Sequence, residues 1–476
     1  MLQCTVTFLP DNIAVPVSLG TTVLKAQIQA GLRPDAPCGG KGTCGKCKVL
    51  LEGKEVLACQ SVIDRDMTVF TEKEERINVL TSGISSRVTA DGEFDYVLAF
   101  DIGTTTVVGY LLDGHKGELL AQESCMNPQS QFGADVISRI QHALDGNGEP
   151  LSRCIRNALT ELTEKVCKTV DISPEAVGTA AIVGNTAMHH LLLNIDPKPL
   201  VTPPYMPAVF EAMEKEKARI LPNIAGFVGG DTVGCMVSTR FDRQEKLTLL
   251  IDIGTNGEMV LGNKKRRIAC STAAGPAFEG AKISCGMRGA RGAVDHVWLE
   301  EGKIKHHVIG DAKPKGLCGS GLLDLVAVLL DTDILDESGY LEGREYTLCE
   351  NVTLTQKDIR EVQLAKAAIR AGIELLAEKM GTEVSDIQQV YLAGAFGNYM
   401  NPASACRIGM IPPVLLDKIE PIGNAAGEGA KLCALSKEEF AYSQKLAKET
   451  EFLELASLPN FQDCYVDALE FEEEAE

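Results

Sequence analysis

Four cysteines lying close together constrain this chain more than any other feature. Cys38, Cys44, Cys47 and Cys59 occur in PCGGKGTCGKCKVLLEGKEVLACQ, with the spacing C-x5-C-x2-C-x11-C. The two residues between Cys44 and Cys47 let both thiolates point at one iron, and the glycines of the loop let backbone amides face the sulfides of a cluster. Four cysteines also suit zinc, but zinc sites usually pair two C-x2-C motifs. The spacing therefore favours a [2Fe–2S] cluster, with zinc as the alternative.

The residues around these cysteines predict a small β-rich domain. Residues 4–10 and 13–31 have the pattern of a strand, a turn, a second strand and a short helix, and residues 47–59 that of a hairpin turning at Glu52 and Gly53. The segment resembles the β-grasp ferredoxins of the vertebrate and bacterial [2Fe–2S] kind, which share the loop C-G-G-x-G-x-C-G-x-C. The resemblance covers about residues 1–77 and implies that the four cysteines bind the cluster. Lys41, Lys46 and Lys48 flank the loop, and we expect a solvated face there, with docking of an acidic donor as the alternative.

The remaining composition is that of an ordinary folded protein. The chain has 476 residues, 45% of them hydrophobic, which suggests about three domains with sizeable cores. Its longest apolar run, residues 321–330, is interrupted by Asp324 and is too short to span a membrane. The N-terminus, MLQCTVTFLPDN, lacks the pattern of a signal peptide. We therefore expect a cytoplasmic protein in which the other twelve of the 16 cysteines are reduced and mostly buried.

The charge of the chain is acidic and uneven. The formal net charge is −20, while residues 1–77 hold nine basic and nine acidic residues and sum to zero. The last forty residues hold twelve acids and three bases, a sum of −9. Such a balance argues against nucleic acid as a partner, since phosphate binding needs a basic surface. We expect the terminal EFEEEAE, residues 470–476, to be a solvated tail.

Two segments share a pattern typical of phosphate binding. YVLAFDIGTTTVVGYLLD (96–113) and LTLLIDIGTNGEMVLG (247–262) each read as an apolar strand, a DIGT turn and a second strand. Backbone N–H groups and threonine hydroxyls at such turns can hold phosphate oxygens, and the aspartates can hold Mg²⁺ through water. Two copies also indicate internal duplication. The candidate residues are Asp101, Gly103, Thr104 and Thr105 in the first copy, and Asp252, Gly254, Thr255, Asn256 and Glu258 in the second.

Three further segments complete the set. VYLAGAFGNYM (390–400) is a buried strand followed by Gly394, Gly397 and Asn398, where glycines allow close approach to a flat ring. FVGGDTVGCMV (227–237) and IGNAAGEGAKL (422–432) are Gly/Ala-rich helix starts, and their small residues predict closely crossing helices at a hinge between two lobes.

With these five segments in this order, the chain resembles the actin-like ATPases, a group that includes sugar kinases, acetate kinases and heat-shock chaperones. The resemblance covers about residues 95–435 and implies two phosphate loops at 101–105 and 252–258, an adenosine loop at 392–398, and connecting helices at 229–237 and 423–430. It places Asp231 where the family has a residue that faces the metal and the attacking water; the alternative is a helix N-cap. His189 and His190 are expected to be structural or surface residues.

A [2Fe–2S] ferredoxin followed by an actin-like ATPase resembles the reductive activators of corrinoid proteins. Residues 127–140, 271–295 and 316–330 are also similar to that family. The resemblance implies ATP-dependent, one-electron reduction of inactive Co(II) corrinoid to Co(I), with a corrinoid protein and an upstream low-potential electron donor as partners, and it allows a homodimer. Larger members have an extra domain where this chain has only about twenty residues, so it is a compact form.

Three alternatives remain at this point. A sugar kinase would have the same cleft but no reason for a ferredoxin. An activator of 2-hydroxyacyl-CoA dehydratases is also an ATP-driven electron donor, but it binds its cluster through cysteines of the ATPase itself. The third alternative is an electron carrier whose nucleotide domain only senses ATP and ADP.

The predicted architecture is therefore α+β and α/β: a β-grasp ferredoxin followed by a two-lobed, ribonuclease H-like ATPase. The expected divisions are a ferredoxin at 1–77, a linker at 78–94, lobes at 95–245 and 246–436, and an acidic extension at 437–476.

Overall fold

The computed structural model describes residues 3–32, 34, 36, 39–42, 45–71, 82–84, 86, 88–133, 135–254 and 256–472. Three predicted site residues, Cys38, Cys44 and Thr255, lie outside the described residues.

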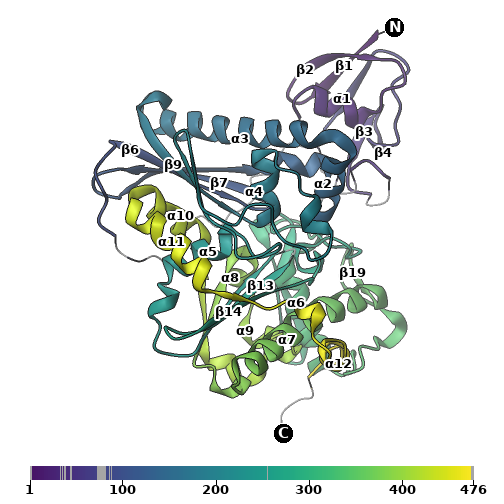
Figure 1. The fold of residues 1–476 in the computed structure, drawn as a ribbon. Coiled ribbons are helices and arrows are strands. Elements are labelled where there is room, and N and C mark those ends of the chain that lie inside the picture. The colour runs from purple at the N-terminus through teal and green to yellow at the C-terminus, as the bar shows by residue number, and fades with distance from the viewer. Residues whose placement is uncertain are drawn as a thin grey trace.

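The N-terminal domain is a small five-stranded sheet that stands beside the main body (Figure 1). Its strand order is β2-β1-β5-β3-β4. The strands are β1 (Gln3–Leu9), β2 (Ile13–Ser18), β3 (Lys48–Leu51), β4 (Lys54–Leu57) and β5 (Met67–Phe70), with the helix α1 (Val23–Gln29). Glu52 and Gly53 adopt positive φ values of 51° and 75°, which suits the tight turn between β3 and β4. The predicted β-grasp arrangement and the hairpin are confirmed.

Two six-stranded sheets form the main body, and five strands of each follow the same order, while the sixth strands, β10 and β22, lie at opposite edges. The first runs β10-β11-β9-β6-β7-β8 and the second β21-β20-β12-β13-β14-β22. In each, the strand that ends in DIGT pairs antiparallel with the next strand and parallel with a later one: β6 with β7 and β9, and β12 with β13 and β20. The internal duplication predicted from the repeated motif is thus present in the strand order.

The strands of the first sheet are β6 (Tyr96–Ile102), β7 (Thr106–Asp113), β8 (Leu119–Met126), β9 (Val177–Gly184), β10 (Met213–Lys215) and β11 (Ala218–Ile220). Those of the second are β12 (Thr248–Ile253), β13 (Gly257–Gly262), β14 (Arg267–Thr272), β20 (Gln389–Ala393), β21 (Ile419–Gly423) and β22 (Glu451–Phe452). Smaller sheets of the second lobe contain β15 (Ala293–Glu300), β16 (Lys303–Val308), β17 (Gly316–Leu317), β18 (Glu345–Cys349) and β19 (Val352–Thr355).

Helices cover both sheets. The first lobe carries α2 (Val136–His142), α3 (Gly148–Thr169) and α4 (Thr186–Leu193). The second carries α6 (Gly319–Asp331), α7 (Gln356–Met380), α8 (Gly394–Tyr399), α9 (Pro402–Arg407) and α12 (Phe461–Asp467). The longest apolar run forms the buried helix α6, where the carboxylate of Asp324 accepts a hydrogen bond of 2.7 Å from the Ser404 hydroxyl. Within the described part of the chain, no helix has both the length and the apolar character needed to cross a membrane.

Two helices cross closely between the lobes, as their small residues predict. They are α5 (Gly230–Ser238) and α10 (Ala425–Leu435). A Cβ atom on Gly429 would lie 2.1 Å from the Gly234 carbonyl oxygen, so only glycine permits this separation. α10 packs on β6 and β9 of the first lobe. The helix α10 therefore packs on the first lobe, although the predicted division assigned its residues to the second lobe, 246–436.

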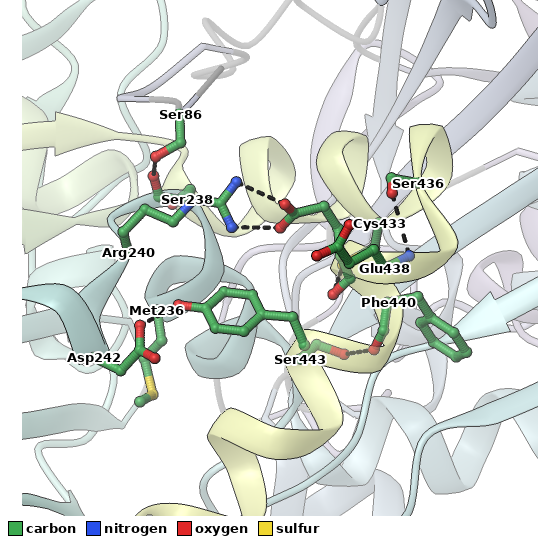
Figure 2. Close-up of polar contacts among 12 residues, drawn as sticks. Ser86, Met236, Ser238, Arg240, Asp242, Cys433, Ser436, Glu438, Phe440 and Ser443 are labelled. Carbon is green, nitrogen blue, oxygen red and sulfur yellow. Dashed lines mark hydrogen bonds and ion pairs between the residues drawn. The ribbon is translucent and has the colours of Figure 1, made fainter. Parts of the chain in front are cut away.

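The acidic extension folds onto the body as far as Glu472. Its helix α11 (Lys437–Glu449) packs against α5 and α10, where Arg240 forms two hydrogen bonds with the carboxylate of Glu439 (Figure 2). Farther along, Phe471 is only 3% exposed and Glu472 pairs with Arg370 at 2.6 Å. The expectation of a solvated tail is therefore wrong for residues 470–472, because the apolar ring of Phe471 anchors them.

Candidate functional site

A cleft of about 550 Å³ opens between the two lobes. Both DIGT hairpins line it, as does the N-terminal end of α8. The predicted residues that it brings together are Asp101, Gly103, Thr104, Thr105, Asp231, Asp252, Gly254, Asn256, Glu258 and Gly394. These residues come from segments up to about 290 positions apart in the sequence, so the fold gathers nearly the whole predicted nucleotide set into one cavity.

Two predicted residues do not line the cleft. The segment expected as an adenosine loop is helical, and Gly397 is buried in α8, where a Cβ would lie 3.2 Å from the Leu392 Cβ. Gly397 therefore permits close packing of α8 on β20, and not the approach of a ring. Asn398 is half-buried on the same helix, and the residues of α8 that do face the cleft beyond Gly394 are Ala395, Phe396 and Tyr399.

Six carboxylates line the cleft, those of Asp101, Asp231, Asp252, Glu258, Glu279 and Asp295. Burial raises the pKa of Asp101 and of Asp252 to about 6, and the pKa of Asp231 to about 7 with Asp252 adding to the shift. Burial likewise raises the pKa of Glu258 well above its usual value. Among the described lining residues, Arg288 is the one lysine or arginine. Such a charge distribution fits a bound cation, because a nearby positive charge would relieve the repulsion.

The carboxylates do not surround a direct metal site. Among the residues that the structure describes, no three His, Cys, Asp or Glu side chains are grouped to hold one ion. Mg²⁺ usually keeps several waters and takes few protein ligands. The arrangement therefore fits a magnesium ion held through water at the phosphates of a nucleotide.

The geometry of α5 excludes one of the two roles considered for Asp231. The N-cap of this helix is Gly229, with no side-chain capping bond, and Asp231 is the second helical residue. Its carboxylate accepts a hydrogen bond of 2.7 Å from the N–H of Thr232 and borders the cleft. The N-cap alternative is therefore wrong.

Close contacts fix the two aspartates at the ends of the DIGT strands. Gly394 has a φ of +80°, and a Cβ there would lie 2.5 Å from Oδ1 of Asp252, so the contact requires glycine. On the other side, Nδ2 of Asn424 donates to Oδ2 of Asp101 at 2.8 Å. Sequence reasoning missed Asn424, although it starts the second connecting helix as its N-cap.

The first DIGT loop rests on a buried arginine that sequence reasoning also missed. Nη2 of Arg139 donates to the Thr104 carbonyl at 2.6 Å, and Nε donates to the Gly133 carbonyl at 2.9 Å. Burial lowers the pKa of Arg139 to about 10. Nδ2 of Asn127 adds a 2.8 Å bond to the Gly103 carbonyl. Both side chains come from the segment 127–140, whose similarity to the family was the one available signal.

Two aromatic rings line the cleft and offer a flat apolar surface. Phe396 stacks on Phe278 with ring centroids 5.0 Å apart and an interplanar angle of 16°. Ser320 at the start of α6 and His307 also line the cleft, and Nδ1 of His307 lies 2.6 Å from Oδ1 of Asp295. These residues had no role in the sequence-based prediction, because they are single positions without a motif.

The second predicted site lies in the N-terminal domain. Cys47 immediately precedes β3 and is 3% exposed, while Cys59 follows β4, so the hairpin brings the two thiols to the same end of the sheet. The loop glycines Gly39, Gly40 and Gly42 have φ values of +61°, +84° and +75°. This is the left-handed conformation that glycine adopts most readily. The described cysteines and loop thus fit a cluster site.

One lysine of the loop contacts the second lobe. Nζ of Lys46 donates to the Gly286 carbonyl at 2.6 Å in a partly buried bond, so the expected solvated face is wrong for Lys46. Lys48 instead pairs with Glu55 of its own domain at 2.8 Å, with both side chains more than half exposed.

These two sites define a class of protein, an iron–sulfur ferredoxin joined to an actin-like (ASKHA) ATPase. Three family models match in the same order: a 2Fe-2S iron-sulfur cluster binding domain at residues 6–72, the RACo middle region at 96–244, and the C-terminal domain of RACo, the ASKHA domain, at 246–476. The cleft is lined by residues of both the second and the third match.

The similarity extends over whole proteins. The corrinoid activation enzyme RamQ of Eubacterium limosum is 33% identical, over 95% of this chain and 96% of that protein. The [Co(II) methylated amine-specific corrinoid protein] reductase of Methanosarcina barkeri is 26% identical over 79% of this chain and 77% of its own. A solved structure, the reductive activator for corrinoid,iron-sulfur protein, matches with a TM-score of 0.71 and 29% identity over 98% of both chains. The chain belongs to the family of reductive activators of corrinoid proteins.

Proposed function

We propose that this protein returns the inactive Co(II) corrinoid of a methyltransferase-system protein to Co(I), using Mg-ATP bound in the interlobe cleft. The main supporting observation is that a cluster domain and a carboxylate-lined nucleotide cleft occur in one chain. Lys46 of the cluster loop bonds Gly286, and the next residue, Met287, lines the cleft. Residues 1–77 would serve electron transfer and residues 95–436 nucleotide binding.

Each group in the cleft has a proposed role. Asp101 and Asp252 hold the water shell of Mg²⁺, while the backbone and hydroxyls of Thr104, Thr105 and Thr255 hold phosphate oxygens. Asp231 orients the attacking water, a role supported by its place in the first turn of α5 at the edge of the cleft. The products are ADP and phosphate. The flat ring of adenine lies beside Phe396.

The four cysteines Cys38, Cys44, Cys47 and Cys59 hold the cluster, which when bound supplies the single electron that converts Co(II) to Co(I). This reduction is thermodynamically uphill for ordinary electron donors. Nucleotide binding therefore favours one arrangement of the lobes, and this arrangement binds or distorts the corrinoid partner more strongly than the other arrangement does. An upstream low-potential donor would supply the cluster with this electron. We further propose a cytoplasmic location, which cell fractionation would test, and a homodimer, which light scattering of the purified protein would test.

The decisive experiment is a spectral assay of Co(II)-to-Co(I) conversion with a candidate corrinoid protein, with and without ATP. The wild-type protein should reduce cobalt, and ATP should accelerate it. Reduction that ATP leaves unchanged would favour the nucleotide-sensing electron carrier.

Cys47→Ser separates the two sites. This variant should lose cobalt reduction, because a cluster ligand is removed, while nucleotide affinity stays at the wild-type value. Cys4→Ser is the matched control, since Cys4 lies in β1 outside the four-cysteine spacing. Equal loss of nucleotide binding in Cys47→Ser would mean that these cysteines are structural.

A further inference from the structure

The segment that joins the ferredoxin to the ATPase is hydrogen-bonded to the second lobe. The N–H of Ile84 donates to the Ile422 carbonyl at 2.8 Å, and the N–H of Asn424 donates to the Ser82 carbonyl at 2.9 Å. Gly83 and Gly423 thereby form an antiparallel bridge. We call residues Ser82–Ile84 the strap. The expected linker is thus fixed, over these residues, to the end of β21.

Steric constraints make this contact specific to glycine on both sides. A Cβ on Gly83 would lie 2.5 Å from the Ile422 carbonyl oxygen. A Cβ on Gly423, whose φ is +66°, would lie 2.3 Å from the Ser82 carbonyl oxygen. Because both obstacles are backbone atoms, no rotamer change could relieve them.

Both connecting helices hold the joining segment. In α10, Oε1 of the buried Glu428 accepts a hydrogen bond from the N–H of Gly83 at 3.2 Å. At the C-terminal end of α5, the Ser238 carbonyl accepts a 2.8 Å bond from the hydroxyl of Ser86 (Figure 2). The segment therefore touches the two helices that a change of lobe angle must move.

One residue connects the strap to the nucleotide cleft. The backbone of Asn424 bonds Ser82, while its side-chain Nδ2 donates to Asp101 at 2.8 Å and lies 3.2 Å from the Tyr110 hydroxyl. Its Oδ1 accepts from the N–H of Gly427 at 2.7 Å and so caps α10. A change at the Asp101 carboxylate therefore reaches the strap through a single residue.

We propose that the strap couples the nucleotide cleft to the segment that joins the ferredoxin to the ATPase, and that Asn424 positions the carboxylate of Asp101. When magnesium and phosphate bind beside Asp101, the side-chain amide of Asn424 changes its hydrogen-bond partner. This change alters the stability of the backbone hydrogen bonds between the strap and β21. The inference rests on nucleotide binding in the cleft, as in the proposed function. Linkage requires the reverse effect as well: opening the strap must change nucleotide affinity by the same factor.

Hydrogen exchange of the full-length protein tests this coupling directly. The probe is a non-hydrolysable ATP analogue with Mg²⁺, and the readout is the exchange rate of the Ile84 and Asn424 amides. We expect the analogue to change both rates by about fivefold or more, the lower end of usual allosteric coupling. Amides of the buried strand β14 are the internal reference, because this strand contributes no residue to the lining of the cleft.

Gly83→Ala provides the reciprocal measurement. The added methyl opens the strap, so the analogue's Kd should change by the factor seen in the exchange experiment, and the ATP stimulation of cobalt reduction should fall. Gly148→Ala is the matched control, because its Cβ would meet only the Asn194 side chain. If Gly83→Ala does not fold, Ser86→Ala removes the hydroxyl that donates to the end of α5 and should shift the Kd in the same direction by a smaller factor.

The outcomes are distinct. If the analogue binds while both amides exchange at unchanged rates, or if Gly83→Ala keeps the wild-type Kd, the coupling is refuted and the proposed function stands. If the wild-type protein does not bind the analogue, the proposed function and the coupling both fall.

Discussion

At the scale of residues, the cleft depends on carboxylates at the ends of two equivalent strands. Asp101 is the next-to-last residue of β6 and bonds Asn424, and Asp252 is the next-to-last residue of β12 and lies against Gly394. Each is thus fixed by a segment far from it in sequence. Burial raises both pKa values; the charge of Asp101 raises that of Asp252 further, and the hydrogen bond from Asn424 offsets part of the shift of Asp101.

Asp252→Asn should weaken binding of the Mg-nucleotide by roughly 10- to 100-fold, the usual effect of losing a group that orients a metal's surroundings. The asparagine keeps the shape of the side chain and removes only the charge. Titration calorimetry with an ATP analogue and Mg²⁺ measures the Kd. Glu300→Gln, at an exposed position of β15, is the control. Wild-type affinity in Asp252→Asn would contradict the assignment of the cleft.

The raised pKa of Asp231, about 7, predicts a dependence of stability on pH. The folded protein binds a proton that the unfolded chain releases, so the stabilisation is full below the unfolded pKa of about 3.8 and is lost as the pH rises through about 7. Asp231→Asn removes this loss. In metal-free protein, the Tm of the variant relative to wild type should therefore rise from pH 5 to pH 8. A constant difference would refute the raised pKa.

At the scale of elements, the crossing of α5 and α10 is the joint between the lobes. A single core cluster holds residues of β6, β12 and both helices, including Val97, Leu250, Val233 and Ala430. The lobes therefore share apolar contacts at this joint, and its spacing depends on glycine.

Gly429→Ala should force the two helices apart and destabilise the protein by about 1–3 kcal/mol, as overpacking usually does. The new methyl would meet the backbone of Gly234 at 2.1 Å. Denaturant unfolding measures the change. In Gly289→Ala the nearest atom to the new Cβ is 4.0 Å away, and the free energy of unfolding should stay within about 0.5 kcal/mol of wild type. Equal stability of the two variants would mean that the crossing adapts.

At the scale of the whole molecule, the cluster loop docks on the ATPase through Lys46 and Gly286. The next residues, Met287 and Arg288, line the nucleotide cleft, and Nη1 of Arg288 lies 3.3 Å from the Met126 sulfur of the first lobe. The cluster loop thus contacts a segment of the second lobe that lines the nucleotide cleft and also contacts the first lobe.

Lys46→Gln should loosen this docking, because a charged hydrogen bond contributes about 1.5–3 kcal/mol. Small-angle X-ray scattering should then give a larger radius of gyration than for the wild-type protein. Lys48→Gln is the matched control, since Lys48 pairs within the ferredoxin domain. Identical scattering of all three proteins would show that Lys46 does not hold the domains together.

The sequence by itself determined the chemistry that depends on short spacing. The four cysteines, the two DIGT hairpins and the small residues of α5 and α10 are local patterns, because a turn or a helix face is built from neighbouring residues. They were sufficient to predict a ferredoxin, a duplicated two-lobed ATPase and most of the cleft.

Only the tertiary structure decided the contacts between distant segments. Asn424 and Asp101 are 323 positions apart, and the side chain of Arg139 reaches Thr104 from a different element. The same holds for the docking of Lys46, the buried Phe471 and the packing role of Gly397. A local pattern carries no information about such pairs, because packing of the whole chain, and not the spacing of neighbours, brings them together.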